Sequence, residues 1–140
     1  MQSTAKWVDG LKSIVGNGRK HSLVIDVPES NNGTDHGPTA LELVGMGLAG
    51  CISTIFAIVA ANSGLVFSGL NVTVDAEKSD GSPTITAARA KVTIVSAEPE
   101  ERIRRVLDKT MKTCPVGLLY EKAGVEIGVE LTVTEPAVAA

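Results

Sequence analysis

Residues 43–65 read LVGMGLAGCISTIFAIVAANSGL, a stretch of 23 residues without one charged side chain. Its length, together with the Ser63-Gly64 pair near its end, predicts one long helix from about Thr39 to Asn62. A helix that is apolar on all sides is either a membrane span or the centre of a protein core. The rest of the sequence has to decide between these two interpretations.

The flanks of this stretch favour the protein core. His36 and Glu42 precede it and the next charge after it is Asp75, so no Lys or Arg anchors either end in a bilayer. The stretch is also rich in small residues, which let another backbone approach closely: Gly45, Gly47, Ala49, Gly50, Ser53 and Thr54. In a chain of 140 residues one sheet covers only one side of such a helix. We therefore expect a second copy of the chain to cover the other side, in a homodimer without membrane contact.

Shorter elements are predicted on both sides of the helix. Strands are expected at 3–9, 21–27, 72–77, 84–96 and 125–134. One further helix is expected to open over 98–101 and to be interrupted at 114–115, and a short one is expected at about 116–122. A loop is expected over 29–37, and Asp80-Gly81-Ser82-Pro83 is typical of a hairpin turn. The order ββ–α–ββ–αα–β favours one α+β domain over residues 1–140.

Two of these elements show clear periodicity. Alternate residues of segment 84–96 form an apolar face, with Ala88, Ala90, Val92 and Ile94 on one side of the strand. The helix after Glu98-Pro99 has an apolar stripe at helical spacing, formed by Ile103, Val106, Leu107 and Met111. Cys114-Pro115 then interrupts the helix.

Composition and charge exclude several classes of function. The net charge of −3 and an aromatic content of 3% do not fit a nucleic-acid-binding surface. No apolar run follows Met1, so we expect no secretory signal and a cytoplasmic protein. Two cysteines in a reducing compartment are more typical of a transient, redox-linked pair than of a permanent disulfide. Because His21 and His36 are irregularly spaced with respect to the cysteines, we expect no metal site.

Two motifs carry a resemblance to a known family. Residues 37–43 (GPTALEL), continuing through Gly47-Leu48-Ala49-Gly50-Cys51, resemble the central-helix signature of OsmC/Ohr proteins, the osmotically inducible and organic hydroperoxide resistance proteins. Thr113-Cys114-Pro115-Val116 resembles their second-cysteine motif, and the 63-residue interval between the cysteines is similar to the family's. With the opening segment Thr4–Trp7 and the strand order, the resemblance covers nearly the whole chain.

The resemblance implies a fold and an activity. It implies an OsmC-like fold, in which an antiparallel sheet wraps around a long buried central helix and two chains interlock as a homodimer. It also implies a thiol peroxidase without a bound cofactor, in which Cys51 attacks a hydroperoxide and Cys114 resolves the sulfenic acid as a disulfide. An external dithiol of lipoyl or thioredoxin type would then reduce the pair. Without the resemblance, each cysteine has an alternative interpretation as a small apolar residue of the core.

The family also uses an Arg and a Glu to activate the first thiol. Arg19 is the candidate Arg, because a guanidinium stabilises a thiolate. The family's Glu position, ten residues before the first cysteine, holds Leu41 here, and the candidate Glu is its neighbour Glu42. On an intact helix Glu42 lies roughly 13.5 Å along the axis from Cys51 and on the opposite side, so it serves only across the dimer or after a helix break. Its alternative role is to compensate the helix dipole.

Two functions therefore remain open. The first is a peroxidase whose apolar wall, from Met46, Ile52, Ile55 or Phe56, favours organic hydroperoxides over hydrogen peroxide. The second is a non-catalytic relative that binds an apolar small molecule, or senses redox state, at the dimer interface. The cysteine pair favours the first function, and the missing Glu at position 41 favours the second.

Overall fold

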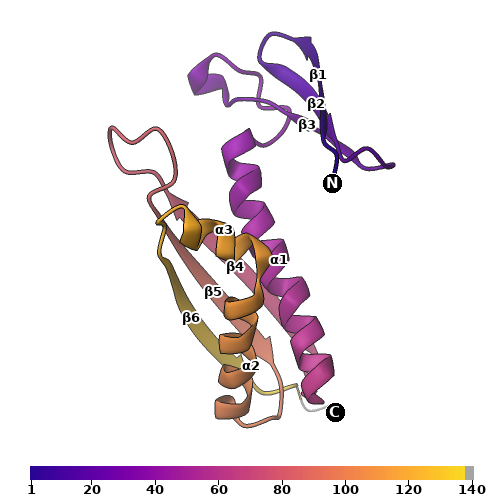
Figure 1. Ribbon diagram of the computed structural model, residues 1–140, viewed down its shortest axis with the longest axis vertical. Helices are drawn as coiled ribbons and strands as arrows, with labels where there is room; N and C mark the ends of the chain where they lie inside the picture. Colours follow the sequence, from indigo (N-terminus) through magenta and orange to yellow (C-terminus); the bar gives the residue numbers. More distant parts are fainter. Residues whose placement is uncertain (138–140) are drawn as a thin grey trace. The chain divides into compact units, whose positions relative to one another are not determined.

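The computed structural model describes residues 1–137. They form two compact units, the first from Met1 to Val44 and the second from Gly45 onward. Each unit contains one three-stranded sheet, and the described residues also form three α-helices. This confirms the α+β class predicted from the sequence. The two units are described in turn (Figure 1).

The sheet of the first unit contains a strand that the sequence does not predict. Its strands are β1 (Thr4–Asp9), β2 (Lys12–Gly16) and β3 (Ser22–Ile25), antiparallel in the order β1-β2-β3. Strands β1 and β3 match the predicted segments, whereas the sequence predicts no strand at β2. With Ile14 and Val15 as its only large apolar residues, β2 has too short an apolar pattern to show alternation. The turn before it relies on the positive φ of Gly10, 47°.

A buried carboxylate organises the loop from β3 to the long helix, which contains the short 3₁₀ helix η1 (Glu29–Asn31). Asp26 accepts hydrogen bonds at 2.6 to 3.2 Å from the backbone N–H groups of Val27, Thr34 and His36 and from the hydroxyl of Thr34. These donors, the Thr34 hydroxyl first, hold the pKa of Asp26 well below its usual range. A side chain at Gly33 would overlap the backbone of Val27, so the loop closes tightly.

The predicted long helix is α1 (Ala40–Ser63), which begins in the first unit and continues through the second. It ends in a Schellman motif, since Gly64 has a φ of 63° and the N–H of Leu65 donates to the Ala60 carbonyl at 2.9 Å. The Arg102 guanidinium donates to the Ser63 carbonyl at 2.9 Å. The end of α1 is therefore fixed by backbone and side-chain hydrogen bonds together.

The sheet of the second unit is mixed, which differs from the antiparallel sheet that the family resemblance implied. Strand β5 (Ala87–Val95) pairs antiparallel with β4 (Gly69–Glu77) and parallel with β6 (Ile127–Thr134). Between β5 and β6 the chain forms α2 (Glu100–Thr113) and α3 (Pro115–Lys122). A crossover of this length returns the chain to the start of the sheet, and the next strand then runs in the same direction.

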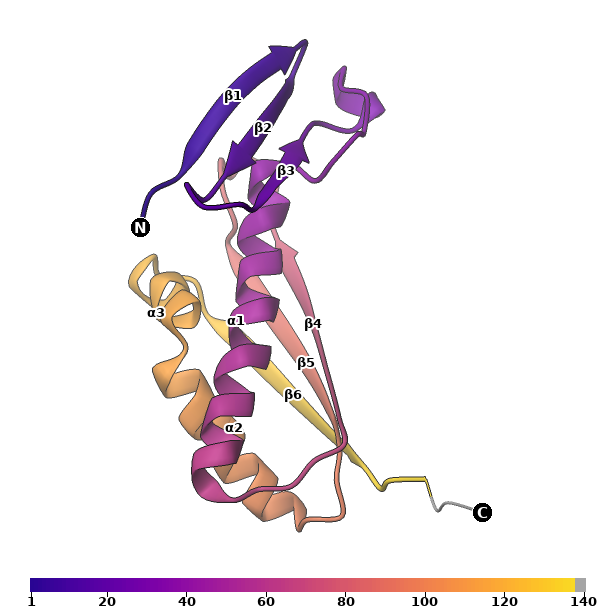
Figure 2. The same ribbon diagram turned by 90° about the vertical axis from the view of Figure 1, so that its right-hand side faces the viewer.

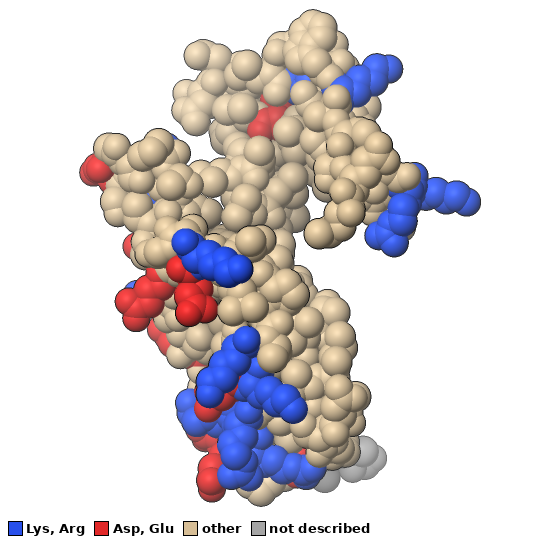
Figure 3. Space-filling view, in the orientation of Figure 1, with Lys and Arg blue, Asp and Glu red and all other residues tan. Residues whose placement is uncertain are grey.

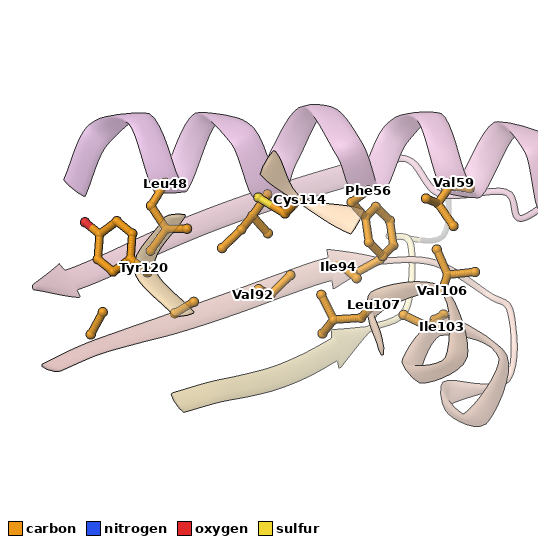
Figure 4. Packing of buried hydrophobic residues seen from close by; sticks show 14 of the residues in the cluster. Leu48, Phe56, Val59, Val92, Ile94, Ile103, Val106, Leu107, Cys114 and Tyr120 are labelled. Carbon is orange, nitrogen blue, oxygen red and sulfur yellow. The ribbon is translucent and has the colours of Figure 1, made fainter. Parts of the chain in front are cut away.

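One face of this sheet and the three helices enclose the core. In both ribbon views α1, α2 and α3 lie on the same side of β4, β5 and β6 (Figures 1 and 2). The predicted inner face of β5 is confirmed, because Ala88, Ala90, Val92 and Ile94 are all buried. They meet a row of buried side chains on α1, Leu48, Ile52, Phe56 and Val59 (Figure 4).

The apolar stripe of α2 is confirmed for three of its four predicted residues. Ile103, Val106 and Leu107 are buried, and Met111 is half-buried. The remaining buried position on this face is Thr110, whose hydroxyl donates to the Val106 carbonyl at 2.8 Å. Because that hydrogen bond satisfies the hydroxyl within the helix, a polar residue is tolerated in the core.

The other face of α1 is uncovered in the single chain. Met46 and Ile58 are 57% and 50% exposed, and a Cβ added at Gly47 or Gly50 would have no neighbour within 4 Å. Figure 3 shows Lys and Arg gathered over α2, next to a surface of α1 without charged side chains. Among the described residues, α1 is the one helix that is long and apolar enough to cross a membrane, judged by length and composition alone.

Candidate functional site

Cys114 lies at the junction of α2 and α3, in the second unit. Its backbone N–H donates to the Thr110 carbonyl at 2.8 Å, and its carbonyl accepts from Leu118 at 2.9 Å. The cysteine therefore ends one helix and caps the next. Pro115 is the first residue of α3, a position where its missing N–H costs nothing. The break that Cys114-Pro115 predicts in the sequence is thus a tight change of direction.

The side chain of Cys114 is completely buried, and its sulfur accepts a hydrogen bond from the backbone N–H of Gly117 at 3.4 Å. Figure 4 shows the sulfur directed toward α1. A Cβ at Gly117 would lie 3.4 Å from Cys114 Cβ, 3.5 Å from its Sγ and 3.9 Å from Ile127 Cδ1. The sulfur is therefore in contact with the first turn of α3 and has no exposed surface.

Cys51 lies on α1 and is half-buried, packed against the same core. It lies close enough to the thiol of Cys114 to raise the pKa of that thiol, and both cysteines are free. The two sulfurs, 63 positions apart in the sequence, are thus neighbours inside one unit. One belongs to a partly accessible side chain and the other to an inaccessible one.

The environment of Cys114 disfavours its thiolate. Burial, followed by the hydrogen bond with Cys51, raises the pKa of Cys114 from 9.0 to about 11. The backbone N–H groups of Gly117 and Val116 act in the opposite direction, as expected at a helix N-terminus, but do not outweigh burial. At neutral pH Cys114 is therefore a protonated thiol.

The surroundings of Cys51 along its helix are apolar. Leu48, three residues before Cys51, is buried, and Ile55, four residues after it, is half-buried, so both lie on its side of α1. Of the other wall residues predicted from the sequence, Ile52 and Phe56 are buried in the core and Met46 is exposed. Ile55 is the predicted wall residue that best fits a position beside the thiol.

The two candidate activating residues belong to the first unit. Arg19 is exposed in a turn, where its backbone N–H donates to the Asn17 side chain at 3.0 Å. Glu42 lies in the first turn of α1, and its carboxylate accepts from the backbone N–H of Thr39 at 2.7 Å. This bond holds the pKa of Glu42 below its usual range. Because α1 is unbroken from Ala40 to Ser63, the helix break that would bring Glu42 to its own Cys51 is absent from the described residues. Catalytic roles for both residues stay predictions.

Two other features complete the description. Residues 1–137 contain no cluster of three His, Cys, Asp or Glu side chains able to hold a metal ion. A pocket of about 240 Å³ lies between the residues just before β4 and those just after β5. Its lining includes Phe67, Ser96 and Glu98. Neither cysteine lines it, so the thiol pair is the better candidate site. The functional feature that the sequence analysis missed is Gly117, whose signal is its place three residues after a helix-capping cysteine.

Comparisons with known proteins identify the family and the fold of the chain. A family model described as OsmC-like protein matches residues 33–130, which include both cysteines. No curated protein matches the chain. Among solved structures, an OsmC-like protein from Mycoplasma pneumoniae is similar with a TM-score of 0.85 and 19% identity, over 95% of this chain and 96% of that one.

Two further similar structures are those of organic hydroperoxide resistance proteins. The protein from Legionella pneumophila has a TM-score of 0.71 and 16% identity, over 96% of this chain and 97% of that one. The protein OhrB of Bacillus subtilis has a TM-score of 0.64 and 15% identity, over 95% and 96%. At these identities the likeness shows a common fold.

Proposed function

Because the chain belongs to the OsmC/Ohr family, we propose that it is a thiol-dependent peroxidase that reduces organic hydroperoxides through Cys51 and Cys114. One observation carries the proposal: the two thiols are neighbours, one half-buried and the other enclosed. Cys51 is the thiol that a peroxide reaches. Cys114 is the neighbouring thiol that resolves the oxidised Cys51.

The reaction has two chemical steps. The Cys51 thiolate attacks the terminal oxygen of the hydroperoxide, the O–O bond breaks, and the product leaves as an alkoxide that takes a proton to become an alcohol. Cys114 then attacks the sulfur of the Cys51 sulfenic acid, and a disulfide and one water molecule form. An external dithiol, of lipoyl or thioredoxin type, restores the two thiols. No resident cofactor takes part.

The neighbouring apolar side chains support an organic hydroperoxide as substrate. Ile55 is half-buried on the Cys51 side of α1, and its exposed part favours contact with an alkyl or aryl group over contact with water. Arg19 is proposed to stabilise the Cys51 thiolate. Arg19→Ala should then slow peroxide consumption, whereas Lys20→Ala, a neighbouring change of the same charge, should leave it unchanged.

A homodimer is part of the proposal. The uncovered face of α1 contains Gly47 and Gly50, which leave room for a second helix backbone. Large apolar residues of the first unit, including Trp7 and Leu23, are 67% and 42% exposed in the single chain. A second copy that covers these surfaces would remove them from water, which drives association. We further propose a cytoplasmic location, where both thiols stay reduced between turnovers.

A second candidate function rests on the position of Glu42. Leu41 occupies the position of the family's Glu, and the Glu42 carboxylate is bound to Thr39. A protein without an activating carboxylate would retain the fold and the proposed dimer. It would bind an apolar small molecule or sense redox state without catalytic turnover.

One experiment separates the two functions. Reduced protein is mixed with one equivalent of cumene hydroperoxide, and the mass and free thiols of wild type, Cys51→Ser and Cys114→Ser are measured. A peroxidase loses about 2 Da in wild type as the disulfide closes, and a sulfenic or further-oxidised acid accumulates only in Cys114→Ser. Wild type that keeps both thiols through this treatment supports the non-catalytic function.

A further inference from the structure

The neighbouring sulfurs are unequal in a way that bears on how their disulfide is reduced. Thiol–disulfide exchange proceeds by attack of a thiolate on one of the two sulfurs, approximately in line with the bond that breaks. Attack on Cys114 Sγ would therefore come from the side away from Cys51. Attack on Cys51 Sγ would come from the side away from Cys114.

The approach to Cys114 is occupied by the protein itself. Its side chain has no exposed surface, and the sulfur is in contact with the first turn of α3. A Cβ at Gly117 would lie at ordinary contact distances, 3.5 Å from the Cys114 sulfur and 3.9 Å from Ile127 Cδ1, so the space beside the sulfur holds no more than about one methyl group. Because the Cys114 side chain has no exposed surface, an incoming thiolate has no path to its sulfur in the folded chain.

The backbone of Cys114 is also held in place. Its N–H donates to Thr110 in α2 and its carbonyl accepts from Leu118 in α3, at 2.8 and 2.9 Å. These bonds use the backbone alone and do not depend on the redox state of the sulfur. Cys51, in contrast, is half-buried, with partial exposure in the single chain.

We infer that an external thiolate reduces the Cys51–Cys114 disulfide by attack on Cys51 Sγ, and that Cys114 leaves toward the backbone N–H of Gly117. Gly117 is then a positioning residue for the departing sulfur. The inference rests on the disulfide of the proposed function and adds the direction of its reduction.

The electrons and protons balance for a dithiol reductant. The first thiolate of the dithiol forms a bond to Cys51 Sγ, the Cys51–Cys114 bond breaks, and its electron pair leaves on Cys114 Sγ. That sulfur takes up one proton, and the second thiol of the dithiol gives up one proton to water and becomes a thiolate. The new thiolate displaces Cys51 from the mixed disulfide, so the dithiol is oxidised by two electrons and both cysteines are reduced.

The departing sulfur needs a hydrogen-bond donor, because a thiolate in this environment is unfavourable. Burial raises the pKa of Cys114 to about 11, and the N–H groups of Gly117 and Val116 are the ones that lower it. Of these two, Gly117 is the donor whose N–H forms a hydrogen bond with Sγ, at 3.4 Å. It is therefore in place before the bond breaks.

The test begins with a disulfide made by diamide, so that it does not depend on peroxide chemistry. The oxidised protein is treated with a monothiol such as 2-mercaptoethanol and quenched with acid. The released thiol is alkylated with a maleimide that reacts under the quench conditions, and peptides are mapped by mass spectrometry. We expect the monothiol adduct on Cys51 to exceed that on Cys114 by about tenfold or more, because the buried sulfur is inaccessible.

Variants of Gly117 test the positioning role. A Cβ at Gly117 would lie at ordinary contact distances from Cys114 and Ile127, so a side chain of one methyl group is the largest that fits there without displacement. Gly117→Val needs more room and should displace the sulfur from the N–H, which slows reduction by about tenfold, the effect of one charge-assisted hydrogen bond. Leu119→Ala, at an exposed position of the same helix, is the control for general weakening of α3.

The outcomes separate this inference from the proposed function. Adducts mainly on Cys114, or equal adducts on both cysteines, would overturn the direction of attack. A wild-type rate in Gly117→Val would overturn the positioning role. A protein that forms the disulfide with diamide but not with hydroperoxide would lose the peroxidase assignment, while the adduct map still decides the direction of reduction. A protein that forms no disulfide with diamide would overturn both.

Discussion

The carboxylate of Glu42 accepts a hydrogen bond from the backbone N–H of Thr39 at 2.7 Å, and the hydroxyl of Thr39 accepts one from the N–H of Glu42 at 3.1 Å. This reciprocal pair is a capping box at the start of α1. It occupies the carboxylate that is the nearest replacement for the family's Glu. Two roles of Glu42, helix capping and catalysis, can therefore be distinguished by experiment.

For the capping role, Thr39→Ala should lower the free energy of unfolding by about 1 kcal/mol, as measured by urea denaturation. Glu42→Gln should preserve most of the stability, because Gln also completes a capping box. Peroxide consumption by Glu42→Gln should equal that of wild type. A folded Glu42→Gln protein that consumes peroxide far more slowly would instead assign Glu42 to the reaction.

The raised pKa of Cys114 predicts a loss of stability in alkali. The folded state keeps the proton to about pH 11, whereas the unfolded thiol loses it near pH 9, so the folded state binds more protons between these values. Stability of the reduced protein should therefore fall as pH rises from about 9 to 11. The same denaturation series on Cys114→Ala should show a smaller decline over this window. Parallel curves for the two proteins would contradict the assignment.

The hydroxyl of Tyr120 predicts an unusual response to its removal. The Tyr120 side chain is buried, and its hydroxyl has no hydrogen-bond partner among the described residues. Burial also raises its pKa. Tyr120→Phe should leave the free energy of unfolding unchanged or increase it by up to about 1 kcal/mol, because an unsatisfied group is removed. Tyr120→Ala, the control for ring packing, should lose about 3 kcal/mol. A marked loss in Tyr120→Phe would reveal a partner for the hydroxyl.

The uncovered face of α1 predicts the effect of a larger side chain at Gly50. In a single chain a Leu at this position would meet no other residue and would favour the helix. In a dimer that packs on this face it would collide with the partner. We expect Gly50→Leu to shift the mass measured by light scattering from dimer toward monomer. Lys109→Leu, on the exposed face of α2, should leave the mass at that of wild type. Equal masses for all three proteins would place the interface elsewhere.

The parts of the fold with strong apolar patterns were predictable from the sequence. The uncharged stretch 43–65 indicated α1, and the alternation from Ala88 to Ile94 indicated the buried face of β5. Strand β2 was not predictable, because only two of its five residues are large and apolar. The parallel direction of β6 follows from how the chain returns after α3, which no local pattern records.

The candidate site was predictable only in part. Cys51 and Cys114 were paired through the resemblance to a family, because a separation of 63 residues does not by itself bring two side chains together. Their unequal burial depends on the packing of α1, α2 and α3. The contribution of Gly117 is a backbone N–H, which every residue except proline carries, so residue type gave no sign of it.

Because Cys114 is the capping residue of α3, a change in the bonding of its sulfur is also a change in the local stability of that helix. The two processes are thermodynamically linked: whatever loosens the first turn of α3 alters the balance between dithiol and disulfide, and oxidation alters the tendency of that turn to fray. Amide hydrogen exchange at the start of α3 would then differ between the oxidised and reduced protein. Exchange at these amides would thus report the bonding state of the Cys114 sulfur without an activity assay.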